Sequence, residues 1–243
     1  MRTLQLLLAF CLCAHYSYGQ LMAVPTESAE LPQRNKQQLY KHVPFDLEGG
    51  LIFVPAIMDG QCDSFILDTG APTLVINTQF FVSDLDGGRA VGLSGTMNIQ
   101  SLTIRGFEFG LKNRKKINGF ATDFSHLEQI KKRRIRGLIG YEVIRHQEML
   151  IDYTKKRLTF IHSDAKQEVD GYAAVDYVKF KIRDHFPIVK VKIGKRYYFF
   201  GIDTGAEVNV LSKHLCKKLK RHCKESGERK QLQGLDQSKA IAS

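Results

Sequence analysis

The chain has 243 residues, of which 43% are hydrophobic, enough for one large or two small domains with packed cores. Its formal net charge is +11, and the basic residues cluster at residues 112–116, 131–136 and 213–229, which could attract nucleic acid or acidic lipid. No stacking aromatic residues interleave with these runs, so we interpret them as solvated loops and a basic helix face, and we expect no nucleic-acid partner.

The first 19 residues have the pattern of a secretory signal peptide. Arg2 supplies a positive charge, residues 4–13 form an apolar run, and residues 17–19 form a small-x-small cleavage site. A buried strand or a membrane anchor is the alternative. Cys11 and Cys13 suggest lipoprotein processing, but the bulky residues before them disfavour it. We expect an exported protein, periplasmic or secreted, without a lipid anchor, and no later segment is long enough to span a bilayer.

Three cysteines remain after the signal peptide, namely Cys62, Cys216 and Cys223. An odd number does not indicate a disulfide framework. Cys216 and Cys223 are seven residues apart in a predicted helix, too far apart to form a disulfide while that helix holds. No cysteine or histidine spacing is typical of a metal site, so we expect no metal and no cofactor.

The chain then begins a series of short strands. Residues 20–36 are polar and are predicted to be a flexible lead-in. Strands are predicted at residues 42–47, 51–58 and 64–67. Asp59-Gly60 is typical of a two-residue hairpin turn, so Asp68 follows a strand that folds back on its predecessor.

Short strands continue after this point, and helix is scarce. The pattern predicts a helical turn within residues 77–85, a hairpin over 90–104, a strand at 107–109, a polar loop over 112–129, a helix from 141, and a hairpin from 149–153 and 157–161. This spacing of short strands predicts an all-β fold.

A polar segment at residues 163–172 is predicted to be a linker, and the strand pattern then restarts. Residues 186–193 alternate in polarity, and residues 197–202 form the strand that leads to Asp203. Residues 212–220 resemble a basic helix. We therefore expect two related units, at residues 37–162 and 173–243.

One motif occurs in both units. In residues 65–77 an apolar run leads into Asp68-Thr69-Gly70-Ala71. Residues 200–212 repeat this pattern 135 positions later, with Asp203-Thr204-Gly205-Ala206. Each copy continues into an apolar pair closed by Asn or Ser. A single Asp-Thr-Gly can be an ordinary turn, but two copies on strand ends in matched context indicate a shared role.

Two such carboxyl groups would have a specific chemistry if the units packed about a pseudo-twofold axis. Asp68 and Asp203 would then meet, and two adjacent carboxyl groups cannot both ionise easily, so one keeps a proton. The charged member could take a proton from a water molecule while the protonated member donates to a substrate carbonyl. That arrangement hydrolyses an amide without a covalent intermediate.

Other hydrolytic arrangements find no support. The histidines beyond residue 100 show no triad or ligand spacing and are predicted to lie on the surface; they are His126, His146, His162, His185, His214 and His222. Ser64, Ser94 and Ser212 lie in no nucleophile-elbow pattern, which disfavours serine hydrolysis.

The two motifs, together with Leu138-Ile139-Gly140, resemble the retropepsin-like aspartic proteases. The likeness covers residues 40–162 fully and 175–243 in part, and it is strongest to exported bacterial members with two lobes in one chain. Ala71 and Ala206 are similar to the retroviral type rather than the pepsin type.

The resemblance implies retropepsin-like or pepsin-like lobes related by a pseudo-twofold axis, with Asp68 and Asp203 as the catalytic pair of an endopeptidase acting on a peptide or protein. It implies that Thr69 and Thr204 hydrogen-bond across to the opposite lobe and, with Gly70 and Gly205, support the pair. It also implies that an apolar-apolar-Gly segment packs across the strand that carries the Asp. A flexible flap is expected at Gly92, Leu93, Ser94 and Gly95, with a counterpart near Gly234.

The second unit departs from this pattern. Asp68 and Gly140 are 72 residues apart, whereas only 40 residues follow Asp203, without a second apolar-apolar-Gly segment. We expect an incomplete second lobe, and a fragmentary chain. Two alternatives therefore stay open: a non-catalytic peptide-binding or scaffold protein that keeps the fold, and a homodimer built on Asp68 in which Asp203 is dispensable.

Overall fold

A computed structural model describes residues 9–10, 40–80, 86–91, 96–162, 172, 174–222, 230–233 and 239–242. The expected cleavage site, the lead-in at 20–36, most of the expected linker, and the expected flap tips at 92–95 and 234 lie outside these residues. The described part of the chain is all-β, as predicted, with four sheets and a few short helices.

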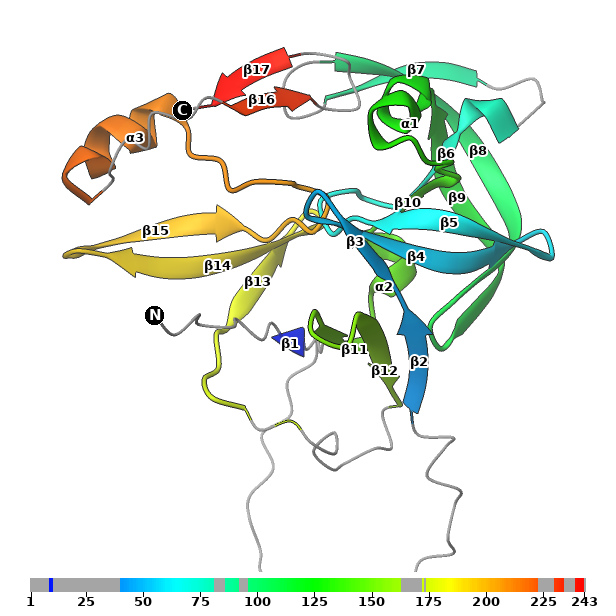
Figure 1. Cartoon of the computed structure of the whole chain (residues 1–243), viewed down its shortest axis with the longest axis horizontal. Coiled ribbons are helices and arrows are strands. Elements are labelled where there is room, and N and C mark those ends of the chain that lie inside the picture. Colours follow the sequence, from blue (N-terminus) through cyan, green and yellow to red (C-terminus); the bar gives the residue numbers. More distant parts are fainter. Residues whose placement is uncertain are drawn as a thin grey trace, which may run out of the picture.

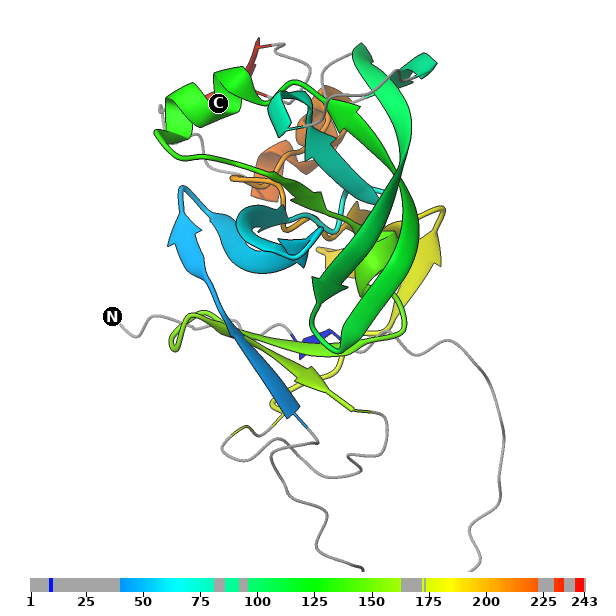
Figure 2. The same ribbon diagram turned by 90° about the vertical axis from the view of Figure 1, so that its right-hand side faces the viewer.

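The first unit is built on an eight-stranded sheet (Figures 1 and 2). In spatial order its strands are β3 (Asp46–Glu48), β4 (Leu51–Met58), β5 (Gln61–Leu67), β10 (Gly137–Ile139), β6 (Leu74–Asn77), β9 (Lys112–Thr122), β8 (Thr96–Phe109) and β7 (Asp86–Val91). Strand β4 also pairs with β8, so the sheet curls back on itself.

A second sheet and three short helices complete this unit. The sheet order is β1 (Ala9–Phe10), β11 (Glu148–Asp152), β12 (Arg157–Ile161) and β2 (Tyr40–Pro44). The helices are η2 (Thr78–Phe80), α1 (Ser125–Lys131) and α2 (Tyr141–Ile144). The hairpin predicted around residues 154–156 is confirmed by the β11–β12 pairing.

Both faces of the motif-bearing strand are buried. Phe65 and Leu67 belong to one apolar cluster and Ile66 belongs to another on the opposite face. All three side chains are at most 2% exposed. A strand buried on both faces reads as a continuous apolar run rather than an alternating one, which explains the sequence that precedes Asp68.

Strand β10 lies between the two strands of the first motif. It runs parallel to β5, with Leu138 opposite Ile66, and antiparallel to β6, with Leu138 opposite Val75. A side chain at Gly137 would collide with the carbonyl of Val75, because the backbones lie so close. This matches the expectation that an apolar-apolar-Gly segment packs across the strand that carries Asp68.

The second unit has fewer elements. β13 (Phe180–Arg183), β14 (Phe186–Ile193) and β15 (Arg196–Gly201) form a three-stranded sheet in that order. They are followed by α3 (Lys213–Leu219), η3 (Lys220–His222) and a separate hairpin of β16 (Lys230–Gln233) and β17 (Lys239–Ala242). The predicted basic helix is confirmed, and Ser212 caps it by accepting a hydrogen bond from the Leu215 N–H at 3.2 Å.

The segment after the second motif differs from its counterpart in the first unit. Residues 74–77 form the buried strand β6, but residues 208–211 form no strand, and Val210 is 46% exposed. Within the described ranges, β15 pairs only with β14, so its other side is an open edge. β10 pairs with β5 in the first unit, but no described strand of the second unit pairs with the free edge of β15 in the same way.

One predicted loop is wrong. Residues 112–129 contain the eleven-residue strand β9 and helix α1. Ile117 and Ala121 are buried on one face of β9, whereas its basic residues at 112, 115 and 116 are exposed. The sequence did not predict this strand, because the first half of β9 is rich in charged residues and only its second half alternates in polarity. The predicted strand at 107–109 is the end of the much longer β8.

The basic run at residues 131–136 is not a solvated loop as interpreted. Arg133 pairs with Asp46 at 2.8 Å, and its guanidinium lies 4.4 Å from the ring centre of Phe53. Arg136 lies over the Phe80 ring at 4.8 Å. These contacts attach the link between α1 and β10 to the sheet, so part of the positive charge has a structural role.

Candidate active site

Two strands deliver the two motifs to one place. β5 ends at Leu67 and β15 ends at Gly201, and Figure 1 shows the two strand ends approaching each other at the centre of the molecule. The Asp68 N–H donates to the carbonyl of Ile139 in β10 at 3.0 Å. The buried sheet of the first unit therefore holds the first motif directly.

The threonines of the two motifs exchange hydrogen bonds. The Thr69 N–H donates to Thr204 Oγ1 at 3.0 Å, and the Thr204 N–H donates to Thr69 Oγ1 at 3.0 Å. Each hydroxyl then donates to a carbonyl of the opposite motif strand, Thr69 to Ile202 and Thr204 to Leu67, both at 2.8 Å. The four bonds form two reciprocal pairs, and they join segments 133 to 137 residues apart in sequence.

Each carboxyl group lies over the glycine of the other motif. A Cβ atom built on Gly70 would lie 2.8 Å from the Asp203 carboxyl carbon, and one built on Gly205 would collide with the Asp68 carboxyl group. Only glycine leaves room for this close approach. The geometry brings together Asp68 and Asp203, with Thr69, Gly70, Thr204 and Gly205 around them, which are six of the ten residues named from the sequence.

The pair has an unusual protonation equilibrium. Burial, the charge of Asp203 and a side-chain hydrogen bond with Asp203 together raise the pKa of Asp68 to about 7. The N–H groups of Gly70 and Ala71 oppose this shift by donating to Asp68 Oδ1 at 2.8 and 3.1 Å. Asp68 therefore keeps its proton over the mildly acidic range, in which an ordinary aspartate is ionised.

The two carboxyl groups differ in exposure. Asp68 is half-buried, whereas Asp203 is exposed and accepts a hydrogen bond from the Gly205 N–H at 2.8 Å. The difference follows from the packing, because Asp68 follows β5, which lies between β4 and β10, while Asp203 follows an open-edged strand. The proton of the pair is therefore favoured on Asp68.

Two further contacts join the units beside the pair. His185 Nε2 lies 2.9 Å from the carbonyl oxygen of Gly70, and Lys131 Nζ lies 2.7 Å from Glu207 Oε1. The sequence predicted His185 to be a surface residue, and that prediction is wrong, because the side chain is half-buried against the first motif. No spacing in the sequence signals this contact, since it depends on how the β13–β14 turn meets the other unit.

The expected flap is described only in part. The arms β7 and β8 pair antiparallel, and the last described pair before the tip is Val91 with Thr96. Gly92, Leu93, Ser94 and Gly95 lie outside the described residues, so their role as a flap stays a prediction.

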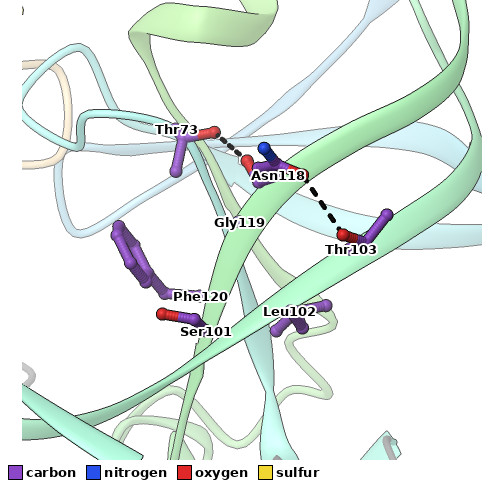
Figure 3. A pocket seen from close by; sticks show the side chains of 7 residues that line it. All are labelled: Thr73, Ser101, Leu102, Thr103, Asn118, Gly119 and Phe120. Atoms are coloured by element: carbon purple, nitrogen blue, oxygen red, sulfur yellow. Dashed lines mark hydrogen bonds between the residues drawn. The ribbon is translucent and has the colours of Figure 1, made fainter. Parts of the chain in front are cut away.

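A pocket of about 460 Å³ opens on the first unit beside β8 and β9 (Figure 3). Thr73, five residues after Asp68, lies in its wall and donates to the carbonyl of Asn118 at 2.7 Å. Thr103 donates to the Asn118 side chain at 3.2 Å. Neither aspartate lines this pocket.

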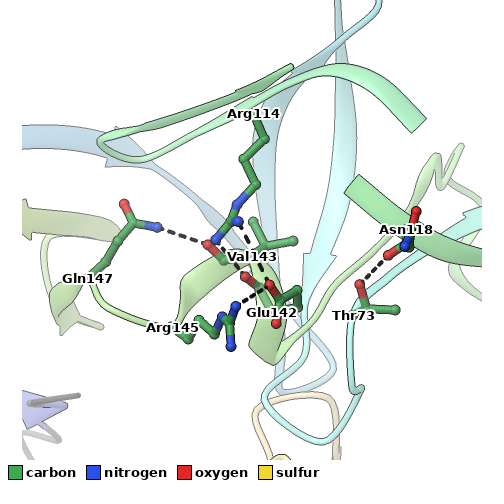
Figure 4. Close-up of polar contacts among 7 residues, drawn as sticks. All are labelled: Thr73, Arg114, Asn118, Glu142, Val143, Arg145 and Gln147. Atoms are coloured by element: carbon green, nitrogen blue, oxygen red, sulfur yellow. Dashed lines mark hydrogen bonds and ion pairs between the residues drawn. The ribbon is translucent and has the colours of Figure 1, made fainter. Parts of the chain in front are cut away.

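A polar cluster fixes helix α2, which follows Gly140 (Figure 4). The Arg114 guanidinium donates to the carbonyl of Glu142 at 2.7 Å, and Arg145 pairs with the Glu142 carboxylate at 2.9 Å. The Gln147 amide donates to the carbonyl of Val143 at 3.2 Å. The Arg114 contact holds α2 against β9, and the cluster is structural in this arrangement.

The described residues contain no group of three or more His, Cys, Asp or Glu side chains that could hold a metal ion. In the same part of the chain, no helix is both long and apolar enough to cross a membrane. Cys62 and Cys216 are free and exposed.

No protein-family model matches this chain, and no curated protein sequence matches it. Among solved structures, it is similar to a retropepsin-like aspartic protease from Rickettsia conorii, with a TM-score of 0.37 and 16% sequence identity. The similarity covers 50% of this chain and 90% of that one, and it concerns the fold alone.

Proposed function

We propose that the chain is an aspartic endopeptidase in which Asp68 and Asp203 together activate a water molecule against a peptide bond. The observation that carries this proposal is the reciprocal placement of the two motifs: four threonine hydrogen bonds, and each carboxyl group over the opposite glycine. Such an arrangement holds the two carboxyl groups at one point, where they can act on the same water molecule.

The raised pKa of Asp68 determines which carboxyl group acts as the acid and which acts as the base. Asp68 carries the shared proton and donates it toward the oxygen of the peptide carbonyl. Ionised Asp203 takes a proton from the water as the water oxygen bonds to the carbonyl carbon. The tetrahedral diol then collapses as a proton passes to the amide nitrogen, and the C–N bond breaks to give an acid and an amine.

The test is cleavage of an unstructured protein and of a mixed fluorogenic peptide library, between pH 3 and 7. Asp68→Asn and Asp203→Asn should each lower kcat/KM by at least about a hundredfold, because each removes one half of the acid–base pair. Asp59→Asn is the matched control: it makes the same change in an exposed turn, at a φ of 51° that Asn tolerates, and activity should not change.

A non-catalytic peptide-binding protein is the second candidate. It is favoured by the exposure of Asp203 and by the absence of a strand at residues 208–211. In that case the unmodified chain would not hydrolyse peptides, and both Asn variants would bind them as the unmodified chain does. Isothermal titration with the same peptides separates the two functions.

A homodimer built on two copies of Asp68 is the third arrangement. The bonds between Thr69 and Thr204 lie within one chain, and this favours the intramolecular pair. A dimer would retain activity in Asp203→Asn and lose it in Asp68→Asn, so the same two variants decide the question.

We also propose that the protein is exported and works as two lobes, at residues 37–162 and 173–243. The signal-like pattern of residues 1–19 supports export, and it implies that the edge strand β1, which lies within it, is removed from the mature protein. N-terminal sequencing of the protein recovered from its source should find Gln20 as the first residue; an intact Met1 would contradict this.

A further inference from the structure

His185 contacts the backbone of the first motif from the other unit. It lies in the turn between β13 and β14, directly before Phe186, whose ring centre is 4.6 Å from its own. Its Nε2 atom is 2.9 Å from the carbonyl oxygen of Gly70. A carbonyl oxygen only accepts hydrogen bonds, so Nε2 must carry a proton. The contact therefore defines the tautomer of the neutral ring.

The Gly70 carbonyl is one end of a peptide group that also contacts Asp68. The other end of that peptide is the Ala71 N–H, which donates to Asp68 Oδ1 at 3.1 Å and to the Asp68 carbonyl at 3.2 Å. A donor on the carbonyl end polarises a peptide group and strengthens donation by its N–H end. His185 is therefore two hydrogen bonds away from the Asp68 carboxyl group.

The corresponding turn of the first unit cannot do the same for Asp203. Gly49 and Gly50, between β3 and β4, lie against Glu207 of the second unit, in the position that the β13–β14 turn takes against the first motif. Glycine has no side chain, so this turn offers no side-chain donor. The imidazole contact thus distinguishes Asp68 from Asp203 within an otherwise symmetric arrangement.

We propose that His185 is a positioning residue for the reaction: its Nε2–H holds and polarises the Gly70–Ala71 peptide, so that the Ala71 N–H stabilises negative charge on Asp68. The inference rests on the proposed function. The ionisable groups near this contact are Asp184 on the same turn, and Asp68 and Asp203 where the motifs meet. Stabilising charge on Asp68 opposes the effects of burial and of Asp203, and so keeps the pair able to pass its proton on during turnover.

Two variants of the full chain separate the hydrogen bond from the bulk of the side chain. His185→Leu removes the donor, and His185→Gln keeps a neutral N–H donor that does not titrate. The carboxyl carbon of Asp68, followed by NMR in aspartate-labelled protein, should titrate roughly half a pH unit higher in His185→Leu. His185→Gln should restore most of the original titration.

The kinetic readout should follow the same order. In His185→Leu, kcat should fall about threefold with KM little changed, and His185→Gln should recover it. His214→Leu is the control, because His214 is exposed on α3 and should alter neither readout.

Two results would overturn the proposal. One is an Asp68 titration in His185→Leu that is identical to that of the unmodified chain. The other needs no variant: a nitrogen NMR spectrum of the unmodified chain showing neutral His185 as the Nδ1–H tautomer. Both measurements stand if the chain cleaves no peptide, so failure of the proposed function and failure of the histidine contact are distinguishable.

Discussion

At the scale of single residues, Thr69 does the most to join the two units. Its side chain is 2% exposed, and its hydroxyl both accepts from the Thr204 N–H and donates to the Ile202 carbonyl. A buried hydroxyl with both roles filled leaves two backbone groups without partners when it is removed.

Thr69→Val should therefore lower the free energy of unfolding by about 2–3 kcal/mol, because valine has the same shape but satisfies neither the N–H nor the carbonyl. Urea denaturation measures the loss. Thr69→Ser keeps the hydroxyl and is the control, with a loss of about 1 kcal/mol for the missing methyl group. Equal losses in the two variants would show that the hydroxyl is not what matters.

At the scale of elements, β10 organises the first unit, and its end is sterically constrained. A Cβ atom at Gly140 would collide with the carbonyl groups of Thr73 and Ala71. These are backbone atoms, so no change of side-chain rotamer relieves the overlap. The φ of Gly140 is −97°, which any residue can adopt, so the constraint is one of space alone.

Gly140→Ala should lower the free energy of unfolding by more than about 3 kcal/mol, because it forces β10 away from the first motif. The comparison variant is Gly60→Ala, where nothing lies within 4 Å of the added Cβ but φ is +78°. That variant should cost only about 1 kcal/mol. Thermal unfolding of both proteins checks the order, and a milder effect at position 140 would mean that the β5–β10–β6 packing is loose.

The sequence predicted some elements better than others for clear physical reasons. Asp59-Gly60 predicted its hairpin correctly, because both residues have the positive φ that such a turn requires. The repeated Asp-Thr-Gly predicted which carboxyl groups meet, because the two matching strand ends come together in the fold. Strand β9 was missed, because exposed lysines replace its alternation. The His185 contact was beyond sequence reasoning, because it joins a turn to a carbonyl 115 residues away.

At the scale of the whole molecule, the two units are unequal. The first encloses two apolar clusters, whereas the second exposes Tyr197 at 56% and Phe199 at 61% on its strand β15. The Lys131–Glu207 ion pair and the threonine hydrogen bonds attach the second unit to the first. The site between them therefore depends on the stability of the complete fold.

The raised pKa of Asp68 predicts how the stability of the fold changes with pH. The pKa of Asp68 is about 7 in the folded chain against 3.8 for an ordinary aspartate. Between these values the unfolded chain has released the proton while the folded chain still binds it, so stability falls as pH rises. The slope from this group is at most about 1.4 kcal/mol per pH unit, between about pH 4 and 7.

Asp68→Asn should remove that slope, because asparagine does not titrate. Melting temperatures of both proteins at pH 4, 5.5 and 7 measure the difference, which should favour the variant increasingly as pH rises. Asp123 and Asp152, whose pKa values are lowered, act at more acidic pH and are common to both proteins. Parallel melting curves would mean that Asp68 titrates normally.

The hydrogen bonds between the two threonines also set an order of events during synthesis. Thr69 finds its partners only in residues 202–204, so a growing chain can complete its first sheet while the aspartate at its end still stands alone. The second motif follows 135 residues later, which at ribosomal speeds is on the order of ten seconds. Under the proposed function, the nascent chain has no complete pair of aspartates during that interval, so the pair forms only after the second motif has been made.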